Sequence, residues 1–173
     1  MIPHDFGMDL TDYRKCGKKM ETPRIYECID CKGKGLLYRH GFYKKYAITE
    51  DESTQILICR LKCRHCKNAF SVIPDFLIPK FQHTLSTVIN RLKEFIEFKR
   101  TKGSRQLLAF YLKRYMNNIN WIHSFFVILG DRSGVPEDKK ERATKYLKMI
   151  RDFGESTFLR RSKGHLSSYF MAN

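Results

Sequence analysis

The sequence lacks an apolar run long enough to cross a bilayer as a helix. Its first residues, Met1-Ile-Pro-His-Asp, also lack the basic and apolar regions of a secretory signal. We therefore expect a soluble, cytoplasmic protein without a membrane partner. Disulfides are rare in that reducing compartment, so the six cysteines are expected to be metal ligands or free thiols.

Acidic residues are scarce. The chain of 173 residues has 18 Asp and Glu against 33 Lys and Arg, which gives a formal net charge of +15. Residues 32–48 and residues 60–67 each hold several Lys and Arg and no acid. A surface that is charged only for solubility usually mixes both signs, so these runs favour a polyanionic partner, with nucleic acid preferred to an anionic membrane.

Internal repeats, low-complexity segments and a regular alternation of strands with helices are absent as well. Without a βαβ pattern, a Cys-x2-Cys pair is outside the usual setting of a redox centre. This absence matters because the strongest motif of the chain consists of two such pairs, Cys28/Cys31 and Cys63/Cys66.

The two cysteine pairs predict a metal site. Two residues between cysteines let a tight turn direct both sulfur atoms at one point, and a second pair completes a tetrahedron. We therefore expect Zn²⁺ as a cofactor, held by Cys28, Cys31, Cys63 and Cys66. A four-cysteine site has no open position for water, so this zinc is expected to hold a fold rather than to catalyse.

Other residues near the pairs are alternative ligands. Cys59 is the main one, because strand alternation would put it on the same face as Cys63. Cys16 precedes both pairs and is more typical of a small buried hydrophobic residue. His40 and His65 are further alternatives, although His65 lies inside the second Cys-x2-Cys loop, where contact with solvent or phosphate is expected.

Strand formers, prolines and helical spacing predict an α+β fold, with a small antiparallel zinc ribbon before an all-helical domain. In chain order we expect an irregular leader (1–24), a zinc ribbon (25–70), a connector (71–83) and a helical domain (84–173). Thr84 and Ser104 are expected helix N-caps. A first helix is expected to start at Thr84, and two further helices are expected to cover 104–116 and 119–129. A fourth should start at Pro136 and end at Gly154, and a last short helix or tail should follow within 156–171.

The residues around the second pair resemble a known family. The run Arg60-Leu-Lys-Cys63-Arg-His-Cys66-Lys-Asn-Ala-Phe70 resembles the second knuckle of transposase-type zinc ribbons. Ser71 to Pro79 resembles an uncharacterised bacterial family of mobile-element proteins, a domain of unknown function with a Pro-x-Phe-Leu-x-Pro connector and C-terminal helices. The likeness covers residues 25–100 and implies DNA binding, with the same four cysteines as ligands.

The sequence departs from such transposases in its C-terminal half. Their catalytic core places three separated carboxylates on a large α/β domain, which this chain does not have. Its available acids occur at helix starts and on solvated faces: Asp131, Asp138, Glu141, Asp152 and Glu155. We therefore expect no enzymatic activity, and a metal-dependent nuclease or transposase is the least favoured alternative.

The leading hypothesis is a zinc-stabilised DNA-binding protein of a mobile element, acting as an accessory factor or regulator of transposition or recombination. The ribbon would contact the phosphates of duplex DNA, which fix position but not sequence. The expected contact residues in the ribbon are Arg39, His40, Tyr43, Lys44, Lys45, Arg60, Lys62, Arg64 and Lys67.

Base contacts would come from the helical domain. The break at residues 98–103 between two amphipathic helices resembles a helix-turn-helix corner. Arg pairs with guanine and Gln with adenine, so the expected contacts are Lys102, Ser104, Arg105 and Gln106. Capping and solvation explain the same residues equally well.

Two alternative functions remain besides duplex DNA binding. A regulatory adaptor would dock on a recombinase, a transposase or a polymerase, and an exposed apolar face on helix 119–129 would favour it or a homodimer. An RNA-binding protein would use the same basic hairpin. RNA competition and co-purification separate these alternatives from duplex binding.

Overall fold

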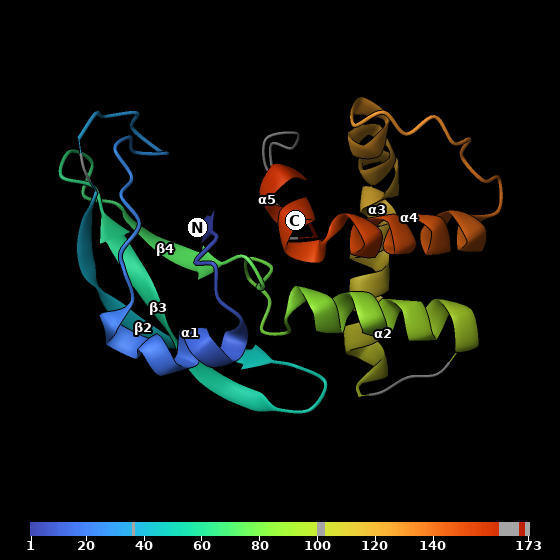
Figure 1. The fold of residues 1–173 in the computed structure, drawn as a ribbon, viewed down its shortest axis with the longest axis horizontal. Helices are drawn as coiled ribbons and strands as arrows, with labels where there is room; N and C mark the ends of the chain where they lie inside the picture. Colours follow the sequence, from blue (N-terminus) through green and yellow to red (C-terminus); the bar gives the residue numbers. More distant parts are fainter. Residues whose placement is uncertain (36, 100–102, 163–169, 172–173) are drawn as a thin grey trace.

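The computed structural model describes residues 1–35, 37–99, 103–162 and 170–171. A four-stranded sheet with helix α1 lies at one end of the molecule, and helices α2–α5 lie at the other (Figure 1). This arrangement confirms the expected α+β class, with most helices C-terminal to the strands. Within the described part of the chain, no helix is both long and apolar enough to cross a membrane.

The sheet has the strand order β1-β4-β3-β2. Strands β2 (Tyr38–Ile48) and β3 (Ser53–Lys62) form the antiparallel hairpin that the strand formers predict. Strand β4 (Ala69–Pro74) pairs antiparallel with β3, and β1 (Ile2–His4) adds parallel to β4. The sheet is therefore mixed and larger than the expected ribbon, and β4 uses residues that we expected in the connector.

Residues 1–24 are ordered into elements rather than forming the expected irregular leader. After β1, helix α1 (Leu10–Cys16) is capped by Asp9, and a 3-10 turn follows at Gly17–Lys19. Such short elements carry too few residues for a visible periodicity. They are held by distant contacts: Tyr13 is buried, and its hydroxyl donates a hydrogen bond to the Leu57 carbonyl of β3.

The two faces of the sheet are covered by different parts of the chain. Ile56 and Ile58 of β3 pack with Tyr13 in the cluster that includes α1. Cys59 and Leu61 belong to a second cluster, which contains two of the paired cysteines. Because side chains alternate along a strand, β3 joins both clusters, and the cysteine site closes the second one.

The helical part consists of α2 (Leu85–Phe98), α3 (Arg105–Ile128), α4 (Lys139–Phe153) and α5 (Glu155–Ser162). In Figure 1, α3 crosses α2 and α4. The expected N-caps are confirmed, because the Thr84 side chain accepts from the Thr87 N–H and the Ser104 side chain from the Leu107 N–H. Trp121, Phe125 and Phe126 of α3 join the helical core.

Two expected helix boundaries are wrong. Helix α3 runs through Asn117-Asn118 without a break, and Asn118 Nδ2 donates to the Arg114 carbonyl one turn earlier. An Asn inside a helix costs less than about 1 kcal/mol relative to Ala, and buried residues on both sides outweigh that cost. Helix α4 starts at Lys139 with Asp138 as its N-cap, so Pro136 lies before the helix.

A buried carboxyl group lies where the sheet meets α5. Asp75 follows β4, and its backbone N–H donates to the His4 carbonyl. Arg160 of α5 pairs with Asp5, and its Nε lies 3.8 Å from Asp75 Oδ2. Burial and the nearby Asp5 charge raise the pKa of Asp75, Arg160 opposes both effects, and the result is a pKa of about 6.

Asp75→Asn is expected to stabilise the protein at pH 8 by about 1–2 kcal/mol. In the native state the Asp75 carboxyl holds its proton more tightly than in the unfolded chain, so the free energy of unfolding falls as pH rises from about 4 through 6. The amide removes this loss. Urea denaturation at pH 5 and pH 8 measures the effect, which should be about half as large at pH 5 as at pH 8.

The matched control is Asp152→Asn, which makes the same change at an exposed position on α4. It should shift the free energy of unfolding equally at both pH values, and only slightly. An Asp75→Asn gain that is as large at pH 5 as at pH 8 would show that ionisation of Asp75 is not the cause.

Candidate metal centre and basic surface

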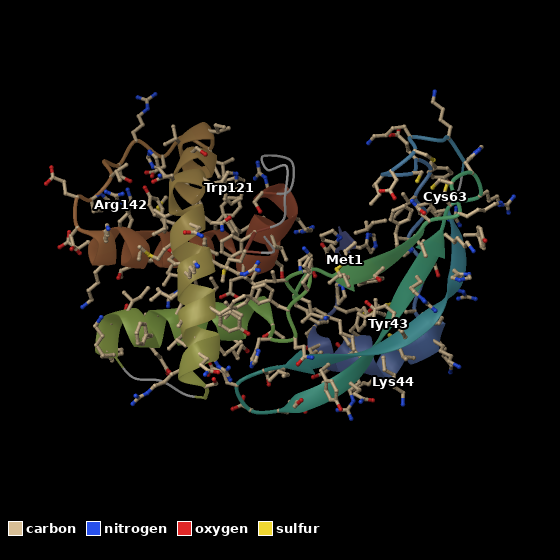
Figure 2. All side chains as sticks on the ribbon, turned by 180° about the vertical axis from the view of Figure 1, so that it is seen from behind. Met1, Tyr43, Lys44, Cys63, Trp121 and Arg142 are labelled. Carbon is tan, nitrogen blue, oxygen red and sulfur yellow. The ribbon has the colours of Figure 1, made fainter. Side chains whose placement is uncertain are left out.

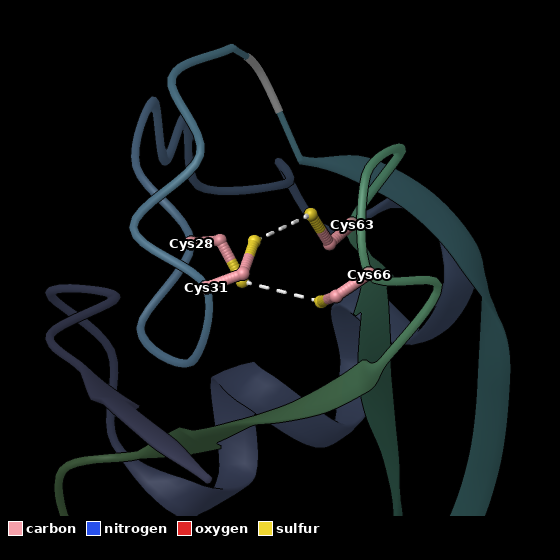
Figure 3. A group of neighbouring side chains, drawn as sticks. All are labelled: Cys28, Cys31, Cys63 and Cys66. Atoms are coloured by element: carbon pink, nitrogen blue, oxygen red, sulfur yellow. Dashed lines mark hydrogen bonds between the residues drawn. The ribbon is translucent and has the colours of Figure 1, made fainter.

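The four paired cysteines meet at one point. The sulfur atoms of Cys28, Cys31, Cys63 and Cys66 all lie within 4.8 Å of one another. Figure 3 shows the two pairs facing each other, with Cys28 Sγ 3.7 Å from Cys66 Sγ and Cys31 Sγ 3.8 Å from Cys63 Sγ. Cys28 and Cys63 are buried, whereas Cys31 is exposed. This group can hold a metal ion.

The two cysteine turns are built alike. The N–H of Cys28 donates to the Gly33 carbonyl, and the N–H of Cys63 donates to the Asn68 carbonyl, five residues further in each case. Each turn has a lysine directly after its second cysteine, and both lysines have a left-handed backbone, with φ of 56° at Lys32 and 62° at Lys67. The repeated Cys-x2-Cys-Lys run is the sequence signal for this geometry, which the sequence analysis did not use.

His65 connects the two turns instead of binding metal. Its Nε2 lies 3.1 Å from the Lys34 carbonyl oxygen, which can only accept a hydrogen bond. A Cβ atom at Gly33 would lie 2.9 Å from His65 Cδ2 and 3.2 Å from Cys31 Sγ, so this position has room only for glycine. The imidazole therefore helps to place the first turn against the second.

Backbone donors prepare the Cys63 sulfur for metal binding. Burial alone would raise the pKa of Cys63, but the N–H groups of Cys66 and His65, together with the Cys28 and Cys66 thiols, lower it to about 6. At Cys66 the N–H of Asn68 lowers the pKa, whereas burial and the three neighbouring thiols raise it to about 12. The four sulfur atoms therefore cannot all be thiolates at neutral pH unless a cation compensates their charge.

The alternative ligands lie outside the cluster. Cys59 is buried in the core behind it, where its sulfur lies 3.9 Å from the Arg60 carbonyl, and burial raises its pKa. Cys16 Sγ lies 3.7 Å from Met8 Sδ on the α1 side of the sheet. Cys59 does not join Cys63 because Cys63 lies beyond the end of β3, where strand alternation no longer holds. His40 lies within β2, near the register shift of the hairpin.

Exposed cations surround the cysteine cluster. We call this surface the basic end; its members are Lys32, Lys34, Arg39, Arg64 and Lys67. The Arg39 guanidinium lies 5.7 Å from the Phe42 ring centroid, and that of Arg64 lies 5.9 Å from the Tyr38 ring centroid. Glu27 and Asp30 are acids in the same region, and Asp30 accepts a hydrogen bond from Asn68.

The remaining predicted contacts of the ribbon are not gathered at the basic end. Figure 2 labels Tyr43 and Lys44 further along the sheet, away from Cys63. Lys44 and Lys45 are consecutive on β2, so they point to opposite faces of the sheet. Arg60 lies 5.9 Å from the Tyr43 ring centroid, and Lys62 at the end of β3 is half-buried. Arg39, His40, Arg64 and Lys67 are the predicted contacts that share the exposed surface near the cluster.

The expected helix-turn-helix residues lie at the start of α3. Arg105 and Gln106 are exposed in its first turn, while the Ser104 hydroxyl is used as the N-cap. Lys102 lies outside the described residues. Lys99 ends α2 in a left-handed conformation, with φ of 56°. The described part of this corner therefore leaves Arg105 and Gln106 as its exposed polar candidates.

Residues 28–106 match the family model for a domain of unknown function (DUF6431). The match begins at the first cluster cysteine and ends at the start of α3, so it includes the four cysteines, the hairpin, β4 and α2. It confirms the expected likeness to a domain of unknown function and does not test the transposase-type ribbon. No curated protein and no solved structure matches the chain.

Proposed function

We propose that this protein is a zinc-stabilised, non-catalytic DNA-binding protein. The observation that carries the proposal is a four-sulfur cluster placed within a surface of exposed cations. A tetrahedral zinc with Zn–S bonds of about 2.3 Å requires sulfur atoms about 3.8 Å apart. The closest pairs of the cluster, at 3.7 Å and 3.8 Å, fit that ion.

The zinc would have a structural role. Bound by four cysteines, it supplies a closed crosslink between the loop before β2 and the loop after β3. The small apolar cluster on this face contains two of the ligands, Cys28 and Cys63, so it is completed by the metal site. This crosslink would hold the two basic turns in a fixed relation to each other.

The basic end would contact the sugar-phosphate backbone. Guanidinium groups such as Arg39 and Arg64 bind phosphate well, and their aromatic neighbours limit the positions that they sample. Lysines 32 and 67 would add point charges. Base contacts would come from Arg105 and Gln106 if α2 and α3 act as a helix-turn-helix. Residues 60–70 resemble transposase-type ribbons and residues 71–79 resemble a family of mobile-element proteins, which supports a role as accessory factor or regulator in a mobile element.

Salt-dependent binding to a labelled random duplex tests this function. With zinc-loaded protein, we expect the logarithm of the binding constant to fall linearly with the logarithm of salt concentration. Four or five phosphate contacts predict a slope of about −4, at −0.9 per contact. Fluorescence anisotropy between about 50 and 200 mM salt measures it. A slope near zero, or stronger binding to a matched RNA duplex, would contradict the proposal.

A second candidate is an adaptor that docks on a recombinase or transposase, or on a second copy of the chain. The observation that favours it is the apolar surface at the end of α3, where Val127, Ile128 and Leu129 are exposed together. Ile128 is 70% exposed, which is unusual for an isoleucine. Weak duplex binding combined with a concentration-dependent mass in sedimentation would favour a second copy as the partner.

A further inference from the structure

A pocket of about 300 Å³ lies between the segment that leads into α2 and the N-terminal half of α3. It is separate from the cysteine cluster and from the basic end. One part of its wall is aromatic, from Phe81, Phe110 and Tyr111, and its rim carries Lys80 and Arg114. None of the described residues that line it is acidic. Its volume is at the lower limit of typical small-ligand sites, roughly 300–1,000 Å³, and suits one planar ring system with a small attached group.

The aromatic wall offers surfaces for stacking. Phe81 stacks on Tyr111 with ring centroids 5.2 Å apart and an interplanar angle of 21°. Phe110 is tilted against Phe81 and is 44% exposed. The Arg114 guanidinium lies 4.4 Å from the Phe110 ring centroid. Aromatic rings and guanidinium planes are the two kinds of group on which nucleobases stack in proteins.

Two cations give the pocket a positive rim. The Arg114 guanidinium is held in place because its Nη1 donates a hydrogen bond to the Met171 carbonyl, 2.8 Å away. Lys80 is exposed, and its backbone has a left-handed conformation with φ of 72°. With no acid in the lining, the rim favours a ligand that carries negative charge.

A polar chain runs from two residues that line the pocket, Tyr111 and His83, to Arg91 of α2. Arg91 Nη1 lies 2.8 Å from His83 Nε2, and because arginine can only donate, Nε2 is the acceptor. A ring whose Nε2 accepts carries its proton on Nδ1, and burial and the Arg91 charge, which lower the pKa of His83, favour this neutral form. Nδ1 then donates to the Tyr111 hydroxyl, 2.8 Å away. The Tyr111 hydroxyl can in turn donate its own proton to an acceptor on a ligand.

We propose that this pocket binds a single nucleotide unit, with the base stacked against Phe110 and Arg114 and the phosphate at Lys80. The combination of an aromatic wall, a buried hydroxyl donor and a cationic rim without acids fits a planar ring that bears hydrogen-bond acceptors and one anionic group. A free nucleotide and an unpaired nucleotide of a single strand share this chemistry. The inference goes beyond duplex binding at the basic end and does not require it.

Calorimetric titration with three probes tests the proposal: deoxyadenosine monophosphate, a single-stranded deoxyadenosine trinucleotide and inorganic phosphate. We expect at least one of the two nucleotide probes to bind, and inorganic phosphate to bind at least about tenfold more weakly, because the base stacking supplies most of the affinity. Binding of the trinucleotide alone identifies a strand as the source, whereas equal binding of the monophosphate identifies a free nucleotide. No binding of either nucleotide at about 5 mM would overturn the proposal.

Phe110→Ala is expected to weaken nucleotide binding by roughly tenfold, the effect of losing one stacked base. Phe110 is already partly exposed, so this variant should remain folded, which its melting temperature would verify. Phe98→Ala removes another exposed phenylalanine, outside this pocket, and should leave the affinity unchanged. Equal affinities of Phe110→Ala and the wild-type protein would overturn the proposal.

Nucleotide binding in this pocket and duplex binding at the basic end can be tested independently. Arg64→Glu lies at the basic end and should weaken duplex binding while leaving binding of the nucleotide probe intact. Phe110→Ala should weaken binding of the nucleotide probe and leave duplex binding intact. Lys80→Ala should reduce the affinity for the nucleotide by about threefold, whereas Lys113→Ala, an exposed cation of α3 outside the pocket lining, should not.

Discussion

Cys63→Ser is expected to abolish metal binding and to unfold the N-terminal sheet. The Cys63 sulfur is buried, faces Cys31 across the cluster and accepts backbone hydrogen bonds that favour its thiolate. A serine hydroxyl cannot replace that ligand. Structural zinc sites contribute about 10–16 kcal/mol in small peptides, which is comparable with the whole stability of a domain, about 5–15 kcal/mol. Metal content should fall from about one ion per chain to nearly none.

Cys59→Ser is the matched control for this prediction. Cys59 is buried in the same apolar cluster as Cys63 but lies outside the group of four sulfur atoms. The substitution should keep the metal and cost about 1–3 kcal/mol, the penalty of burying a hydroxyl. Elemental analysis and far-UV circular dichroism of both variants measure the difference. Full metal content in Cys63→Ser, or its loss in Cys59→Ser, would show that the ligands are misassigned.

The double variant Arg64→Glu/Lys67→Glu is expected to weaken duplex binding by about 100-fold at 100 mM salt. Both residues are exposed in the second cysteine turn, at the centre of the basic end. Each lost phosphate contact should make the salt dependence shallower by about 0.9, and each new carboxylate repels the backbone. Neither side chain is in the core, so the metal content and the circular dichroism spectrum should not change.

Lys139→Glu/Lys140→Glu changes the net charge by the same amount at the other end of the molecule. Both lysines are exposed in the first turn of α4, where glutamate is well tolerated near a helix N-terminus. Its duplex affinity should fall much less than that of the ribbon variant, and its salt slope should stay near the wild-type value. Equal losses in the two variants would show that overall charge, and not the basic end, determines binding.

Local signals account for the parts of the fold that the sequence predicted well. The cysteine spacing constrains a few neighbouring residues strongly, so the four-sulfur cluster follows from it without knowledge of the rest. The helix starts at Thr84 and Ser104 depend on one side chain and one N–H three residues later. The hairpin of β2 and β3 connects adjacent segments. In each case the information lies within a short stretch of chain.

The parts that were missed depend on distant partners. Ile2 pairs with Val72, a contact that no pattern around residue 2 indicates. The continuity of α3 past Asn118 depends on packing against other helices, which outweighs a weak local preference. No local pattern predicts the pocket beside α3, because His83 and Arg114 come from distant parts of the chain and line it together only in the folded protein.

Lys32 and Lys67, which have a left-handed backbone in the two cysteine turns, are expected to lower stability while they supply charge for binding. Glycine adopts that backbone conformation without the cost, about 1 kcal/mol, that a side chain adds. Replacing Lys32 or Lys67 by glycine would therefore relieve strain in the turn while removing a cation from the surface proposed to meet phosphate. The two turns therefore carry backbone strain that glycine would remove, and such a variant would gain stability while losing a cation of the proposed binding surface.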